Sequence, residues 1–179
     1  VILGLLEADT GSVYVDDTPT LIDQAFKQHI GYLPESVAFA EALTGQQVMR
    51  FFARARGVHL NEVSATLCRI GLQSASRRAI RGYSRGMRQR LGLGIAILGA
   101  PNLLILDEPT GGLDQEGISV FWDVLTEWRS EKRMVLLSSH DLTLLEDRVD
   151  RITLLKKGEV IADASPEGLR AGTSLPVRV

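Results

Sequence analysis

Two adjacent carboxylates, Asp107 and Glu108, stand directly after the apolar run Leu103–Leu106. Four consecutive aliphatic residues predict a strand buried on both faces, which is typical of parallel sheets. In open α/β sheets, ligands bind beyond the carboxyl ends of the strands. One carboxylate there can hold Mg²⁺, and the other can orient and polarise an attacking water. A strand end followed by an acidic helix cap explains the pair equally well, so the pair alone does not decide.

A second candidate site is the segment Tyr-Ser-Arg-Gly-Met-Arg-Gln-Arg, residues 83–90. A serine and a glycine at a helix start offer hydroxyl and amide donors at the positive end of the helix dipole, which suits an anion. Three arginines add positive charge. A plain N-cap followed by a basic solvated helix face is the simpler interpretation of this segment when it is taken alone.

A third candidate is His140, which follows Ser138-Ser139 at the end of the apolar run Met134–Leu137. A histidine at the tip of a buried strand can hydrogen-bond a phosphate oxygen or an attacking water. A structural histidine is the commoner case, and we assign that interpretation to His29 and His59.

The elements that must position these residues alternate between strand and helix after residue 101. A strand over 103–106, a helix over 117–130 and a second buried strand over 134–137 predict an α/β fold with a parallel sheet. Residues 152–155 and 159–162 predict a hairpin. Residues 34–81 read as a helical insert, with a capping box at Thr44–Gln47 and a second helix starting near Asn61. A third helix starts near Ser84, after the insert. Leu3, Leu5 and Leu6 suggest the end of a helix, and residues 12–16 and 29–33 suggest short strands.

Composition excludes several classes of protein. The 179 residues are 45% hydrophobic, carry a net charge of -2 and include one cysteine, Cys68. This apolar content argues against disorder, and the sign of the charge argues against a charge-driven nucleic-acid binder. A single cysteine excludes an internal disulfide or a multi-cysteine metal site and fits a reducing compartment. No apolar run approaches the length of a membrane span.

The order of these elements resembles the nucleotide-binding domain of ABC transporters across nearly the whole chain. Gly31-Tyr32-Leu33-Pro34-Glu35 comes first, then the segment 83–90, then Leu-Leu-Ile-Leu-Asp-Glu-Pro, then Gly111-Gly112-Leu113-Asp114, then Ser139-His140-Asp141. The resemblance implies an ATPase that uses ATP and Mg²⁺. It also implies a P-loop NTPase-type parallel sheet core with a helical signature subdomain.

The resemblance implies roles for several carboxylates and for the histidine. Asp107 resembles the Walker B aspartate that holds Mg²⁺, and Glu108 resembles the catalytic carboxylate that activates water. His140 resembles the switch histidine that contacts the γ-phosphate. Glu35 stands where the family usually has the Q-loop glutamine, so a metal contact is plausible but its hydrogen bonding differs.

The resemblance also implies a dimer. Ser84, Arg85, Gly86 and Met87 lie in the signature segment, which binds the γ-phosphate of ATP held by a second ATPase subunit. Asp114 lies in the loop that crosses the interface of a homodimer. Arg85 replaces the first glycine of the signature pair, Met87 replaces its final glutamine, and Gly111 replaces a small polar residue. Several branches of the family tolerate such changes.

The family further implies separate transmembrane permease subunits, docked on the helical insert 34–81, and a cytoplasmic position on the inner face of the cell membrane. It implies no nucleic-acid partner and no membrane span in this subunit. A soluble ABC-type ATPase acting on ribosomes or DNA, and a non-hydrolysing regulatory module, remain the alternatives.

The largest departure is that no G-x-x-x-x-G-K-[ST] phosphate loop occurs in these residues, whose lysines are at 27, 132, 156 and 157. We therefore expect Val1 to lie within the helix that follows that loop, the first strands to be missing, and residues 1–179 alone to be inactive. The expected parts are the end of the first portion of the core (1–33), the helical and signature subdomain (34–100), the Walker B to switch-histidine core (101–165) and the start of a C-terminal extension (166–179).

A narrower likeness concerns the ATPase subunit of the transporter for nitrous-oxide-reductase maturation, a family associated with periplasmic copper-site assembly. It rests on Gly-Tyr-Leu-Pro-Glu at 31–35, Phe-Ala-Arg at 52–54, the segment from Tyr83 onward and Leu-Pro-Val-Arg at 175–178. Nothing in these residues binds copper, because the choice of substrate lies in other subunits.

Overall fold

The computed structural model describes residues 2–15, 18–19, 25–145 and 147–172. The chain divides into two compact units, Val1–Ser138 and Ser139–Val179, and each is described by itself. The predicted α/β architecture with a parallel sheet is confirmed in the first unit. The sequence Leu-Pro-Val-Arg at 175–178 lies outside the described residues.

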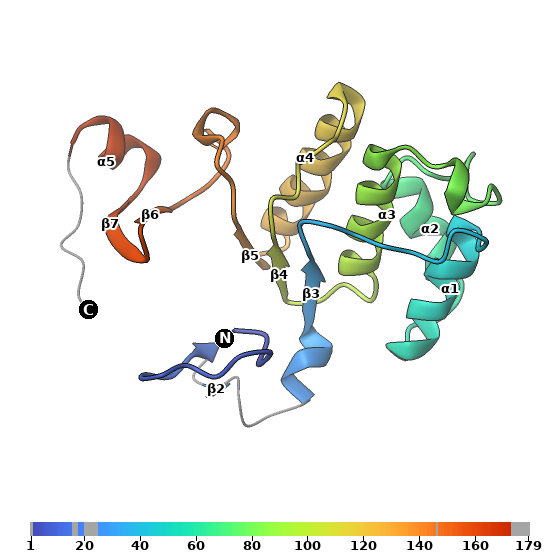
Figure 1. Ribbon diagram of the computed structural model, residues 1–179, viewed down its shortest axis with the longest axis horizontal. Helices are drawn as coiled ribbons and strands as arrows, with labels where there is room; N and C mark the ends of the chain where they lie inside the picture. Colours follow the sequence, from blue (N-terminus) through green and yellow to red (C-terminus); the bar gives the residue numbers. More distant parts are fainter. Residues whose placement is uncertain (1, 16–17, 20–24, 146, 173–179) are drawn as a thin grey trace. The chain divides into compact units, whose positions relative to one another are not determined.

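The first unit is built on a three-stranded parallel sheet of β3 (Ile30–Leu33), β4 (Leu103–Leu106) and β5 (Met134–Leu137), in that order. Leu33, Leu106 and Leu137 are in register, so the three strands end at one edge of the sheet. Figure 1 shows the strands side by side, with β4 in the middle. The residues that follow the three strands are therefore neighbours in space.

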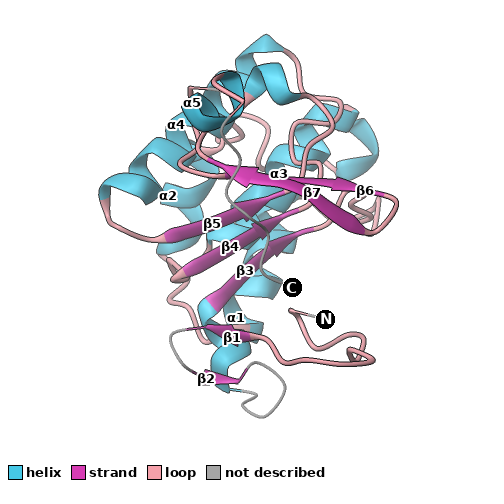
Figure 2. Ribbon diagram, turned by 90° about the vertical axis from the view of Figure 1, so that its left-hand side faces the viewer, coloured by secondary structure: helices cyan, strands magenta, loops and turns pink. Residues whose placement is uncertain are grey.

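Four helices accompany this sheet: α1 (Gly45–Ala55), α2 (Glu62–Arg69), α3 (Arg85–Ile97) and α4 (Gln115–Ser130). Helix α3 packs on β3, α4 packs on β5, and the two helices contact each other, so they cover the same face of the sheet (Figure 2). Helices α1 and α2 pack against α3 and against each other, and a 3₁₀ turn at Ile80–Gly82 leads into α3.

Sequence signals place several of these helix starts. The capping box at Thr44 is confirmed, because its side chain accepts a hydrogen bond from the Gln47 amide and the Gln47 side chain accepts one from the Thr44 amide. Asn61 precedes α2 without capping it through its side chain.

The core of the first unit lies between the sheet and its two covering helices. Leu33, Leu104 and Leu106 are 0 to 1% exposed, and Trp128 and Phe121 of α4 are equally buried. Gly31 allows the closest approach, because a Cβ built there would lie 2.1 Å from the carbonyl oxygen of Ala96 in α3. A side chain at residue 31 would therefore hold α3 away from the sheet.

Strand β5 differs from the prediction that it is buried on both faces. Met134 is 41% exposed and Leu136 is 48% exposed. Through the register they align with residues 30 and 32 of β3, on either side of Gly31. Gly31 faces α3, and side chains alternate between the two faces of a strand, so these positions face the other way. Met134 and Leu136 thus lie on the face away from α3 and α4, on the edge strand of the described sheet.

The first residues also differ from their prediction. Residues 2–6 form turns and bends rather than the end of a helix, and Gly4 has a positive φ of 67°. Glycine disfavours a helix, and the φ of Gly4 lies in the left-handed region rather than the helical one. The short strands β1 (Tyr14–Val15) and β2 (Thr18–Pro19) pair antiparallel, and a 3₁₀ helix, Ala25–His29, precedes β3. Asp16 of the predicted strand 12–16 lies outside the described residues.

The second unit contains the predicted hairpin, formed by β6 (Ile152–Lys156) and β7 (Glu159–Ala164). Its turn residues Lys157 and Gly158 have φ values of 53° and 84°, as tight hairpin turns require. A 3₁₀ turn (Leu142–Leu144) precedes the hairpin and α5 (Pro166–Arg170) follows it. Among the helices of the described residues, none is both long and apolar enough to cross a membrane.

Candidate active site

Asp107 and Glu108 follow β4 at the sheet edge where the three strands end. The Asp107 amide donates to the carbonyl oxygen of Leu33 over 2.8 Å, which ties the position after β4 to the end of β3. On the other side, the Ser138 amide donates to the Leu106 carbonyl over 2.9 Å. These two backbone hydrogen bonds tie the end of β4, where the acidic pair begins, to β3 on one side and to Ser138 after β5 on the other.

The hydroxyl of Ser138 connects the two acidic residues. Its Oγ donates to Oδ1 of Asp107 over 2.6 Å and accepts a hydrogen bond from the Glu108 amide over 2.9 Å. Glu108 has a φ of 43°, in the left-handed region that a residue with a Cβ seldom adopts. Asp107 is exposed and Glu108 half-buried, so solvent reaches the carboxylate edge.

The sequence patterns did not identify Ser138 as a site residue. A hydroxyl that follows one parallel strand lies beside the residue after the neighbouring strand only when the two strands pair in the register seen here, which the sequence alone does not give.

The loop from Pro109 to Asp114 continues from this pair to α4. Asp114 caps α4, since its Oδ1 accepts a hydrogen bond from the Gly117 amide over 2.8 Å. The carboxylate at 114 thus has a structural role in this subunit. Its predicted contact with a second subunit stays a prediction.

The start of α3 packs against the same loop. Gly86 is buried, and a Cβ there would lie 2.9 Å from the carbonyl oxygen of Gly112. A Cβ at Gly112 would meet the side chain of Arg85 at 2.7 Å. The buried side chain of Gln89 donates to the Pro109 carbonyl over 3.4 Å. The predicted signature segment and the loop after the acidic pair are therefore in direct contact.

Ser84 caps α3, because its Oγ accepts a hydrogen bond from the Met87 amide over 3.1 Å. Ser84 and Arg85 are exposed, whereas Met87 is half-buried and receives a hydrogen bond on its sulfur from Arg78 over 3.1 Å. The Tyr83 hydroxyl, directly before Ser84, donates a hydrogen bond to the Ala75 carbonyl over 2.8 Å. Burial of this side chain raises the pKa of its phenol. Hydrogen bonds thus anchor the start of the helix, while Ser84 and Arg85 face solvent.

The structure places the remaining predicted residues in two different units. Glu35 is exposed and lies two positions beyond Leu33, at the same sheet edge as Asp107. His140 is exposed and belongs to the second unit. Its neighbour Asp141 caps the 3₁₀ turn, and the hydrogen bond from the Thr143 hydroxyl holds the pKa of Asp141 below its usual value. The predicted role of His140 stays a prediction.

The donor set at the sheet edge fits Mg²⁺ bound together with a nucleotide. In the described part of the chain, no group of three or more His, Cys, Asp or Glu side chains could hold a metal by itself. Mg²⁺ usually takes one or two carboxylates and completes its shell with water and substrate phosphates. Asp107, exposed and oriented by Ser138, meets that requirement, and Glu35, two positions beyond the end of the neighbouring strand β3, is a candidate for a second carboxylate.

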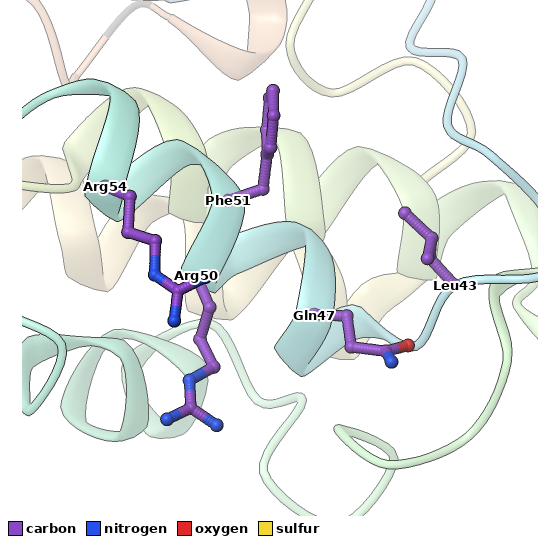
Figure 3. A pocket seen from close by; sticks show the side chains of 5 residues that line it. All are labelled: Leu43, Gln47, Arg50, Phe51 and Arg54. Atoms are coloured by element: carbon purple, nitrogen blue, oxygen red, sulfur yellow. The ribbon is translucent and has the colours of Figure 1, made fainter.

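A separate open pocket lies on the outer side of α1. It has a volume of about 430 Å³ and is lined by Leu43, Gln47, Arg50, Phe51 and Arg54 (Figure 3). The ring of Phe51 is 64% exposed. Among the described residues, no carboxylate forms an ion pair with Arg50 or Arg54. The pocket therefore combines an exposed aromatic ring with two uncompensated positive charges.

Comparison with known proteins agrees with this geometry. Residues 1–111 match the family model described as ABC transporter. The chain is 38% identical over 172 residues to the ABC transporter ATP-binding protein YdbJ of Bacillus subtilis (strain 168), covering 94% of this chain and 56% of that protein. It is 39% identical over 143 residues to the zinc import ATP-binding protein ZnuC of Paracoccus denitrificans (strain Pd 1222), covering 79% and 56%.

A solved structure described as the ATP binding subunit of an ABC transporter superposes with a TM-score of 0.83 at 27% identity, covering 97% of this chain and 75% of that one. The chain spans a little over half the length of relatives such as YdbJ and YhcH of Bacillus subtilis, at 56% and 54%.

Proposed function

The chain belongs to the ABC transporter family, and we propose that it is the ATP-binding and ATP-hydrolysing subunit of a membrane transporter. The observation that carries this proposal is the Asp107–Glu108 pair, which is fixed at the end of the central strand and bordered by the start of α3. A carboxylate pair beside a helix start with exposed donors suits phosphoryl transfer, in which catalysis is mostly positioning and charge stabilisation.

Each residue has a distinct task in this proposal. Asp107, with Glu35 as a second candidate, holds Mg²⁺, which neutralises charge on the nucleotide phosphates when bound. Glu108 orients the attacking water and accepts its proton. His140 donates a hydrogen bond to the γ-phosphate. The left-handed backbone at Glu108 and its tie to Ser138 support a fixed direction for this carboxylate.

We further propose that two copies of this subunit share their ATP sites. Ser84, Arg85, Gly86 and Met87 of one copy contact the γ-phosphate bound to the other, and Asp114 lies in the loop at their interface. The exposed Ser84 and Arg85 at the start of the 13-residue helix α3 support this assignment, because the donors and positive charge there face outward.

The membrane partner is proposed to dock on the helical insert, at the pocket on α1. Phe51 offers an apolar anchor, and Arg50 and Arg54 attract a segment with carboxylates. We therefore propose a cytoplasmic loop of a permease subunit that carries an apolar side chain and an acidic residue. In this proposal the subunit lies in the cytoplasm, on the inner face of the cell membrane.

Co-purification with the permease tests this docking site. We expect Phe51→Ala and Arg54→Glu to weaken recovery of the membrane subunits, whereas Arg77→Glu, an exposed arginine of the same insert outside the pocket, leaves it unchanged. Equal recovery with all three variants would refute the pocket as the docking site.

ATP hydrolysis by the native protein, with whatever sequence flanks residues 1–179, tests the proposed function. We expect the native protein to release phosphate in a Mg²⁺-dependent reaction. The rate should fall at least about 100-fold in Asp107→Asn, because the substitution removes the negative charge that binds Mg²⁺. Asp123→Asn removes the same charge from an exposed position on α4 and should hydrolyse ATP like the native protein. Equal rates in the two variants would contradict the proposal.

Residues 1–179 by themselves are proposed to be inactive, because their sequence contains no lysine-bearing phosphate loop. Phosphate release by the purified 179-residue chain that disappears in Glu108→Gln would disprove this.

The cargo is a narrower question. We propose that the transporter serves nitrous-oxide-reductase maturation, on the strength of the sequence likeness at 31–35, 52–54 and from residue 83 onward. The relatives carry names as different as zinc import, lantibiotic transport and daunorubicin resistance, so membership of the family does not by itself identify the cargo. Loss of this gene should leave nitrous oxide reductase without its copper centres, and a normal copper content would exclude this cargo.

A further inference from the structure

We propose that Ser138 is a positioning residue, which sets the direction of the Asp107 carboxylate and of the Glu108 backbone through one hydroxyl group. This inference rests on the proposed ATPase function. It assigns a task to Ser138, for which neither the sequence patterns nor the family resemblance predicts a role.

The direction of both hydrogen bonds follows from proton counting. A serine hydroxyl has one proton to donate and lone pairs to accept with. The Glu108 amide can only donate, so Oγ of Ser138 is the acceptor over that 2.9 Å distance. The single hydroxyl proton then points to Oδ1 of Asp107 at 2.6 Å. The free lone pairs of Asp107, including both on Oδ2, stay available to water or a cation.

The sheet holds Ser138 in place for this task. Its amide donates a hydrogen bond to the Leu106 carbonyl over 2.9 Å, which continues the hydrogen-bond pattern between β4 and β5 by one residue. The next residue, Ser139, directs its hydroxyl instead to the backbone of Asp141.

Glu108 needs this support because its backbone is strained. With φ at 43°, the residue lies in a region that is costly for any side chain with a Cβ. The Ser138 hydroxyl accepts a hydrogen bond from the Glu108 amide. The Glu108 carbonyl accepts one from the Gly111 amide over 3.1 Å. These two bonds fix the peptide groups on both sides of Glu108 and hence the direction in which its side chain leaves the chain.

Amide hydrogen exchange measured by NMR tests the geometry without reference to activity. In Ser138→Ala, we expect the Glu108 amide to exchange about tenfold faster, because it loses its acceptor. The Gly117 amide, bonded to Asp114, serves as an internal reference and should not change. Ser138→Thr retains a hydroxyl and should keep the Glu108 amide protected. Ser130→Ala removes a hydroxyl bonded only to the Glu127 carbonyl at the end of α4 and is the matched control.

The Mg²⁺ dependence of ATP hydrolysis by the native protein tests the consequence. Mutation of a residue that hydrogen-bonds to a metal ligand typically lowers metal affinity or activity about 10- to 100-fold. We therefore expect Ser138→Ala to raise the half-saturating Mg²⁺ concentration by about tenfold. Ser138→Thr should restore it, and Ser130→Ala should match the native protein. Thermal unfolding of each variant confirms that the fold is intact.

An unchanged half-saturating Mg²⁺ concentration in Ser138→Ala overturns the proposal, whether or not Glu108 exchange is faster, because the hydroxyl would then be structural only. In that case the loss of hydrolysis in Asp107→Asn would still support the ATPase function. If the native protein shows no Mg²⁺-dependent hydrolysis, the ATPase function itself fails, and with it the positioning role that rests on it.

Discussion

Replacing Gly31 by alanine should be far more damaging than replacing Gly94 by alanine, although both glycines lie at close contacts of α3, the first on β3 and the second in the helix itself. A Cβ at residue 31 would lie 2.1 Å from the Ala96 carbonyl oxygen and 2.6 Å from a methyl carbon of Leu104. A Cβ at residue 94 would meet the terminal methyl carbon of Ile70 at 2.6 Å. The first obstacle is backbone, and the second is the movable end of a side chain.

The structure gives the size of the effect. Ordinary contact begins near 3.4 Å, so relieving the clash at residue 31 requires α3 to move away from β3 by roughly 1 Å. Overpacking of this kind costs about 1–3 kcal/mol and occasionally more, and a rigid obstacle favours the upper end. We expect Gly31→Ala to lower the free energy of unfolding by about 3 kcal/mol, or Tm by roughly 6–12 °C for a chain of this size.

For Gly94→Ala, the gain in helix propensity of about 1 kcal/mol offsets the displacement of Ile70. The net change should stay within about 1 kcal/mol of zero. Urea unfolding followed by circular dichroism measures both variants against the native chain. Equal destabilisation by the two substitutions, or a stable Gly31→Ala, would refute the close packing of α3 on β3.

Two further predictions concern single interactions. Thr44→Ala removes the acceptor of the capping box and should lower the free energy of unfolding by about 1 kcal/mol in urea, whereas no change would show that the cap contributes nothing. The hydrogen bonds from Arg151 hold the pKa of Asp163 below its usual 3.8, so their contribution to stability is present above that pH and is lost as the pH falls through the lowered pKa. An NMR titration of Asp163 should have its midpoint below 3.8 and move toward 3.8 in Arg151→Ala, and identical midpoints in the two proteins would disprove the coupling.

Local signals in the sequence were enough to place much of the fold. Thr44 with Gln47 and the lone Ser84 marked helix starts because an N-cap needs only neighbouring residues. The aliphatic runs at 103–106 and 134–137 marked parallel strands.

What escaped prediction depends on contacts between distant residues. The exposure of Leu136 follows from its place on the edge strand of the described sheet, which its aliphatic neighbours do not reveal. The packing of Gly86 on Gly112 joins segments that are far apart in sequence. Ser138 looked like part of a polar strand end until the register of β4 and β5 placed its hydroxyl on Asp107.

The fate of ATP bound to a Glu108→Gln variant of the native protein tests the account most directly. Glutamine keeps the size and backbone of residue 108 but cannot accept the proton of the attacking water. After incubation with Mg²⁺ and radiolabelled ATP, we predict that the variant retains intact ATP while the native protein yields ADP and phosphate. Conversion of ATP to ADP by the variant at the native rate would show that Glu108 does not activate the water.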